Sequence, residues 1–67
     1  LKAEINNLQG GEGSLVLCNL LGQILFIHKV YEEGYHEFSI YLKDGIYIAA
    51  FVSGKIKTTI KIVIMNQ

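Results

Sequence analysis

Apolar and polar residues alternate in short runs along this chain, and glycines separate the runs. The clearest alternation lies near the end, where one side of an extended strand would carry Ile56, Thr58, Ile60, Ile62 and Ile64. The opposite side would carry Lys55, Lys57, Thr59 and Lys61. The runs are rich in β-branched and aromatic residues, and none sustains the i, i+3, i+4 spacing of an amphipathic helix. The pattern therefore predicts an all-β chain.

We expect six strands with turns between them. In chain order they cover Lys2–Leu8, Ser14–Asn19, Ile24–Tyr31, Tyr35–Leu42, Ile46–Val52 and Lys55–Met65. Turn signals at intervals of roughly 9 to 12 residues are typical of a sandwich or barrel and not of βαβ units. The expected fold is an Ig-like antiparallel β-sandwich of six or seven short strands, formed as one domain over residues 1–67.

Individual strands have predicted places in this sandwich. Ile46–Val52 is apolar on both faces, which is typical of a central strand covered above and below. Lys2–Leu8 is more polar and is expected at an edge. The segment 32–34 is expected to close a hairpin between the third and fourth strands, and Ser53–Gly54 is expected as a two-residue turn before the last strand.

The composition is unusually apolar for so small a chain. Of its 67 residues, 51% are hydrophobic, and the mean hydropathy is +0.35. A domain of this size buries only about 60% of the surface of its unfolded chain, so we expect a neighbouring domain or a self-association surface to cover the remainder. The chain contains no proline to interrupt strand pairing. Exposed strand edges therefore suggest a homo-oligomer.

Charge and cysteine content exclude several classes of protein. Six basic and six acidic residues leave no net positive charge, which argues against nucleic-acid binding. The lone Cys18 rules out an internal disulfide and provides too few thiols for a structural zinc site. No apolar run approaches the roughly 18 residues of a membrane-spanning helix. The sequence is expected to be part of a longer protein.

The residues that could carry chemistry do not form a convincing set. Cys18 lies in an apolar run and is expected to be a small core residue. His28 and His36 are expected as partly exposed strand residues near one hairpin, without a third metal ligand. Glu32 and Glu33 are expected to be solvated loop charges. We therefore expect no enzyme, no cofactor and no metal. The lysines Lys55, Lys57 and Lys61 form either a solvated edge guard or a contact surface for an acidic partner or lipid head groups.

Three motifs occur in a recognisable order over residues 13–65. Leu15–Leu25 reads as an apolar strand, Asn, two further residues, Gly22 and Gln23, and a second apolar strand. Leu42–Ile48 contains Leu-x-x-Gly-x-Tyr followed by an apolar residue, with Gly45 and Tyr47. Lys61, Ile62 and Val63 follow near the end. Together these segments resemble the C-terminal sorting domains of the type IX (Por) secretion system of Bacteroidetes.

The resemblance implies a non-catalytic signal domain that follows an N-terminal cargo domain. The outer-membrane secretion machinery would recognise it, in the periplasm during transit, and deliver the cargo to the outer-membrane surface or the medium. The motif residues that would serve as recognition candidates are Gly22, Gln23, Gly45, Tyr47, Lys61, Ile62 and Val63. We place the recognition surface on Lys55–Met65, since a receptor can read an exposed edge by strand addition.

The motif residues also have local structural roles to fill. Gly22 is expected to permit a tight reversal, and Gly45 to occupy a turn in which a Cβ atom would clash. The Tyr47 hydroxyl is expected to reach a backbone partner, as in the tyrosine corner of sandwiches. The family usually begins with a Pro-Asn-Pro-like stretch, which this chain lacks, and Tyr35–Leu42 is one position out of the family phase. An Ig-like accessory or protein-interaction module of a Bacteroidetes periplasmic or surface protein therefore remains an alternative.

Overall fold

The computed structural model describes residues 2–6 and 8–65, and all its regular structure is β-strand. The strands are β1 (Lys2–Ile5), β2 (Gly13–Cys18), β3 (Ile24–Val30), β4 (Gly34–Glu37), β5 (Gly45–Ser53) and β6 (Ile56–Ile64). None of the described residues belongs to a helix that could span a membrane.

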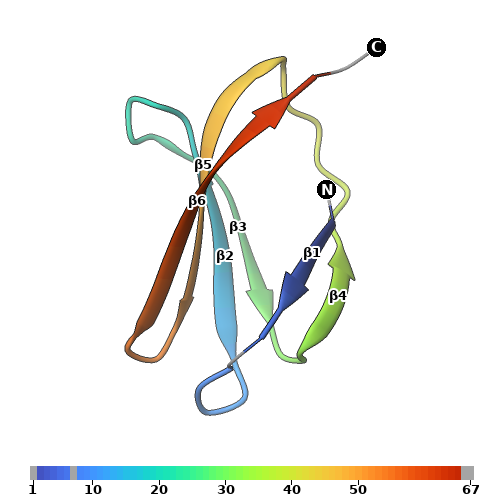
Figure 1. Cartoon of the computed structure of the whole chain (residues 1–67), viewed down its shortest axis with the longest axis vertical. Helices are drawn as coiled ribbons and strands as arrows, with labels where there is room; N and C mark the ends of the chain where they lie inside the picture. The colour runs from blue at the N-terminus through green and yellow to red at the C-terminus, as the bar shows by residue number, and fades with distance from the viewer. Residues whose placement is uncertain (1, 7, 66–67) are drawn as a thin grey trace.

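The strands form two antiparallel sheets that pack against each other (Figure 1). The large sheet has four strands in the order β3-β2-β5-β6, and the small sheet contains β1 and β4. The predicted antiparallel β-sandwich is confirmed. β5 is a central strand, and β1 and β6 each pair with one described neighbour only, so both are edge strands as expected.

The predicted hairpin between the third and fourth strands is wrong. β3 pairs with β2 in the large sheet, whereas β4 pairs with β1 in the small sheet. The connection after β3 crosses from one layer to the other, and Val30, which ends β3, is only 2% exposed and shares the core with Phe38. The backbone N–H of Leu8 then donates to the Glu33 carboxylate at 3.0 Å, which ties the crossing loop to the segment after β1. Glu33 is therefore a structural contact and not only a solvated charge.

Two strands are shorter than expected. β1 ends at Ile5 instead of Leu8, and β4 ends at Glu37 instead of Leu42. After β4, the Ile40 N–H donates to the Phe38 carbonyl at 3.1 Å, and this three-residue turn interrupts the extended ladder. Burial still alternates beyond the turn, with Phe38 buried and Ile40 half-buried. The alternation predicted from the sequence therefore holds for burial after β4, although strand pairing has ended there.

The last turn lies one residue later than predicted. Ser53 is opposite Ile56 in the ladder, so Gly54 and Lys55 form the turn, and Lys55 is not an outward strand residue. The alternation of β6 itself is confirmed. Its side chains that face the small sheet are opposite the inward residues of β5, as in the pairs Ile60–Ala49 and Ile62–Tyr47. We call Ile56, Thr58, Ile60, Ile62 and Ile64 the inner face of β6.

The hydrophobic core lies where the small sheet covers the large one. Its buried cluster consists of Ile5, Leu15, Val30 and Phe38, with Ala3, Leu8, Phe26, Ile40 and Phe51 packed against it. Leu17, Tyr47 and Ala49 are also buried. The core therefore joins β1 and the segment after β4 to β2, β3 and β5, and none of its members comes from β6.

Candidate functional site

The edge strand β6 is the longest exposed element of the molecule. Over its nine residues it pairs with β5 on one side, and no described strand pairs with its other side. Its outward side chains include Lys57, Thr59 and Lys61, all exposed. On its inner face Ile60 is 61% exposed. The strand thus presents unpaired main-chain groups between a basic face and an apolar face.

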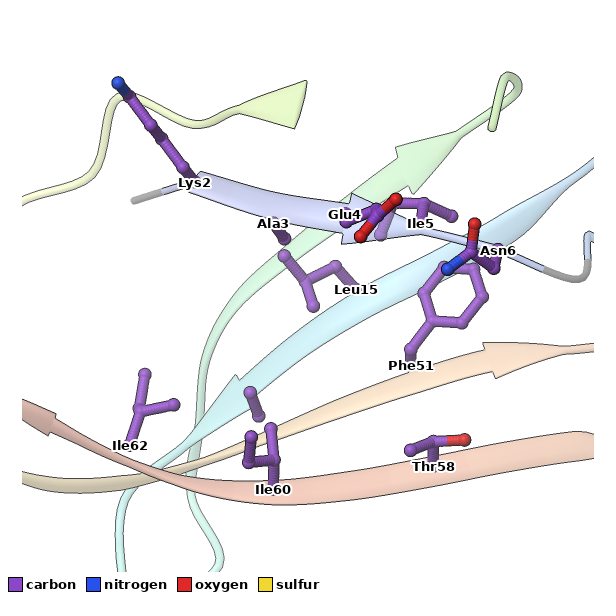
Figure 2. A pocket seen from close by; sticks show the side chains of 11 residues that line it. Lys2, Ala3, Glu4, Ile5, Asn6, Leu15, Phe51, Thr58, Ile60 and Ile62 are labelled. Atoms are coloured by element: carbon purple, nitrogen blue, oxygen red, sulfur yellow. The ribbon is translucent and has the colours of Figure 1, made fainter. Parts of the chain in front are cut away.

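An open apolar groove of about 490 Å³ separates β6 from β1 (Figure 2). Its lining residues are Lys2, Ala3, Glu4, Ile5, Asn6, Leu15, Ala49, Phe51, Thr58, Ile60 and Ile62. In Figure 2 the side chains of Ile60 and Ile62 rise from β6 toward β1, and Leu15 and Phe51 lie between the two layers. One side of the groove is the backbone of β1, whose other neighbour is β4.

The groove exists because the two sheets differ in width. Two strands cannot cover four, and the small sheet packs chiefly on β2 and β3. The accessible surface, 5005 Å², exceeds the about 4,250 Å² expected of a compact protein of this mass. The radius of gyration is 11.9 Å, against about 10.9 Å for a typical compact domain of this length. Both values agree with a sandwich that is open at the groove between β1 and β6.

The first motif forms a tightly bonded loop between β2 and β3. The Asn19 side-chain oxygen accepts the backbone N–H groups of Leu21 and Gln23, both at 3.0 Å. The Asn19 amide donates to Oε1 of Gln23 at 2.7 Å. Gly22 donates its N–H to the Asn19 carbonyl at 3.0 Å and has φ +85°, a conformation that other residues rarely adopt. The expected tight reversal at Gly22 is confirmed, and Asn19 and Gln23 are the residues that bind it together.

The second motif contains a tyrosine corner. Tyr47 is 9% exposed, and its hydroxyl donates to the Lys43 carbonyl at 2.6 Å, which confirms the expected backbone partner. The expected clash at Gly45 is wrong, because a Cβ atom there would be 3.7 Å from the Tyr47 ring, an ordinary contact. Glycine is required by its φ of +158° instead, where a side chain would strain the backbone.

The structure brings the predicted motif residues to one end of the large sheet. Tyr47 is opposite Ile62 in the β5–β6 ladder, and Gly45 is opposite Ile64. Ile48 lies between Lys61 on β6 and Cys18 on β2, and Cys18 leads directly into the loop that carries Gly22 and Gln23. Val63 is on the outward side of the same end, opposite Ile46. Motifs separated by up to forty residues of sequence therefore lie close together.

Exposed apolar side chains gather at this same end, and of these only Val63 is among the recognition candidates predicted from the sequence. They are Leu20 (65%), Leu21 (86%), Ile24 (59%), Leu25 (46%), Ile46 (43%), Val63 (60%) and Met65 (77%). Isolated exposed apolar residues are ordinary, but a concentration at one end indicates a contact surface. The available signal was the pair of leucines inside the Asn19–Gln23 turn, because turns rarely place two large apolar residues in succession.

The outer face of the large sheet is also apolar. Val16, Ile48 and Ala50 are half-buried at its centre, and Ile27 and Val52 are exposed beside them. The described chain does not cover this face, so the expected cover of Ile46–Val52 on both sides is met on the inner face only. Cys18 lies here as well, half-buried, and is not the core residue that was expected.

The two histidines belong to a cluster of aromatic rings around Phe38. The His28 and Phe38 rings meet edge to face with centroids 4.9 Å apart, and the His36 and Phe38 rings stack at 6.1 Å. His28 and Phe38 therefore meet between the two layers and not across a hairpin. The His36 Nε2 is 2.6 Å from the carbonyl oxygen of Glu32. Among the described residues, no group of three His, Cys, Asp or Glu side chains could hold a metal ion.

No protein-family model, no curated protein and no solved structure matches the chain.

Proposed function

We propose that this chain is a non-catalytic C-terminal secretion and sorting domain, read by the outer-membrane machinery of a type IX secretion system. The proposal rests on the sequence resemblance, and one structural observation supports it most. β6, which carries Lys61, Ile62 and Val63, is a nine-residue edge strand with one unpaired side. Such an edge is a template for an incoming strand.

The recognition that we propose is strand addition to β6. Main-chain hydrogen bonds along the free edge would provide affinity, and the alternating side chains would provide specificity. Lys57 and Lys61 on one face select acidic or polar neighbours, and Ile60 and Ile62 on the other select apolar ones. The domain itself performs no chemistry in this proposal, and its cargo would precede it in the protein.

Two other features at the same end of the large sheet support this role, because they fix the shape around β6. The Tyr47–Lys43 hydrogen bond anchors the start of β5, the only described strand that holds β6 in place. The Asn19–Gln23 loop presents Leu20 and Leu21 at the same end of the sheet. A receptor that binds the edge would therefore also meet a defined apolar surface.

A charge reversal on β6 tests the proposal. In a bacterium with a type IX system, a reporter fused ahead of the chain should reach the cell surface, whereas Lys61→Glu should retain it in the periplasm. The matched control is Lys29→Glu, because Lys29 is an exposed lysine on the same outer face but on β3, at the opposite edge. Protease accessibility of the reporter measures delivery. Normal surface display of Lys61→Glu would contradict recognition through this part of β6.

Removal of residues 61–67 is the stronger test of the sorting role. Retention in the periplasm is expected, since the deletion removes the last motif together with the last four residues of the edge strand. Full surface display after this deletion would refute the sorting role. It would favour the accessory-module alternative, in which the deletion affects only stability or partner binding.

A further inference from the structure

We propose that two copies of this chain form a two-fold dimer in which β6 of each copy adds to the free edge of β1 of the other. The inference is independent of the sorting proposal, because it rests on the open side of the sandwich alone. It assigns to the groove between β1 and β6 one occupant, the β6 strand of a second copy.

The free edges make this arrangement self-complementary. β1 has no described neighbour opposite β4, and β6 has none opposite β5. The arrows in Figure 1 show that β1 and β6 run in opposite directions. A two-fold axis between the layers and along the strands preserves strand direction, so β1 would pair antiparallel with the partner's β6. Each layer then has six strands in the order β4-β1-β6-β5-β2-β3, with the last four from the partner.

The same operation covers the apolar floor of the groove. The inner face of β6, with Ile60 at 61% and Ile56 at 36% exposure, would lie opposite the inner face of the partner's β6. The chain exposes about 750 Å² more than a compact monomer of its mass, and the open groove contributes to this excess. If each of two copies buried that amount, the total buried area would lie in the range of about 1,200–2,000 Å² that is typical of a stable interface.

The charges beside the new pairing are complementary. On the solvent side of β1, Lys2 is already opposite Glu37 of β4, whereas Glu4 is opposite Tyr35 and has an exposed carboxylate. The partner's β6, which would pair with β1, carries the exposed lysines Lys57 and Lys61 on its outward face. Opposite charges on neighbouring strands favour the pairing, and no acidic side chain of β6 opposes it.

Dimerisation and receptor recognition would use the same edge. A dimer covers the free side of β6, so the sorting machinery that we propose would read the monomer. The two proposals fail separately, because delivery is measured in cells on fused cargo and dimerisation is measured on the purified chain.

Sedimentation equilibrium of the purified chain tests the dimer, with an expected mass of twice 7.5 kDa. Ile60→Lys should convert it to monomer, since two lysines would be buried face to face at the centre of the interface. Val63→Lys is the matched control. Val63 is 60% exposed, almost the same as Ile60, and lies on the same strand but on the outward face, so this variant should remain dimeric.

A second variant probes the charge complementarity without changing the apolar floor. Glu4→Lys should raise the dissociation constant by roughly two- to fivefold, and the difference from the native chain should shrink in high salt. Circular dichroism checks that each variant keeps its β structure. If Ile60→Lys fails to fold, Glu4→Lys and its salt dependence decide the question.

Several results would overturn the proposal. The first is a native chain that stays monomeric at high concentration, and the second is an Ile60→Lys variant that still dimerises. Dissociation by Val63→Lys alone would move the interface to the outer face of the large sheet, and growth beyond a dimer would replace the closed two-fold contact with an open one. A Glu4→Lys variant with native affinity would remove β1 from the interface.

Discussion

Leu17 on β2 and Ile60 on β6 face the same way in the same sheet, yet their environments are opposite. Both are in one cross-strand row with Ala49 of β5 between them. Leu17 is 0% exposed, and Ile60 is 61% exposed. The difference is the small sheet, which lies over β2 and β3 and stops short of β6.

Which side chains of a strand share a face and which of them are buried are two separate properties. Alternation determines which side chains share a face, because successive residues of a strand point to opposite sides. Burial depends on what lies above that face, which the strand itself does not specify. In this molecule, the more regular apolar alternation belongs to the strand that is the less buried of the two.

The largest effect on folding is expected for Leu17→Ala. The side chain is completely buried, so its truncation should lower the free energy of unfolding by about 2–5 kcal/mol, a large part of the total for so small a domain. Urea denaturation followed by circular dichroism measures the loss. Leu21→Ala is the control, since Leu21 is 86% exposed and should change stability very little. Equal losses for the two variants would contradict the assigned core.

Ser53→Ala should have the next largest effect, because Ser53 is a buried polar anchor on β5. Its Oγ accepts the Gln9 N–H at 2.6 Å and donates to the Glu12 carbonyl at 2.6 Å. The variant leaves both backbone groups without this partner, so a loss of about 1–3 kcal/mol is expected in the same assay. Thr59→Ala removes an exposed hydroxyl and should be nearly neutral. A neutral Ser53→Ala would mean that this end of β5 is as open as β6.

Tyr47→Phe should reduce stability by about 1 kcal/mol, through loss of the hydroxyl bond to the Lys43 carbonyl. The ring and its burial are retained, so the fold should not change. Thermal unfolding should show a lower midpoint for this variant, and Tyr41→Phe, at an 83% exposed position, should match the native chain. If the midpoint of Tyr47→Phe stays native, the tyrosine corner does not stabilise the start of β5.

The smallest effect is expected for Ile60→Ala, measured at a concentration where the chain is monomeric. The side chain makes little contact in the monomer, and the loss of β-propensity costs less than about 1 kcal/mol. Urea midpoints at low and high protein concentration distinguish its effects on folding and on association. A loss as large as that of Leu17→Ala at low concentration would show that the groove closes in the monomer.

Much of the fold could be predicted from local residue patterns. The inward residues of β6, the central place of β5 and the turn at Gly22 all follow from alternation and from the chemistry of glycine. The sequence also predicted that the Tyr47 hydroxyl would bond to a backbone group, although not that this group would be the Lys43 carbonyl. The pairing of β4 was not, because nothing local distinguishes a hairpin at residues 32–34 from a crossing between sheets. That choice depends on Val30 and Phe38 packing together in one core.

The candidate site was predicted in part for the same reason. Lys61, Ile62 and Val63 could be placed on an edge strand from their position after the last turn. The groove could not be predicted, since it is produced by β1 from the start of the chain and β6 from its end. Nor could the exposure of Leu20 and Leu21, which depends on the Asn19 hydrogen bonds that shape their loop.

The order of residues alone determined that this chain forms strands, where most of them turn, and which side chains share a face, because these are properties of neighbouring residues and backbone sterics. Only the tertiary structure decided which strands pair and how far one layer covers the other. Those outcomes depend on contacts between residues distant in sequence, such as Ile5 with Phe38 and Leu15. The open side along β6 is one of them, because a two-stranded layer cannot cover a four-stranded one.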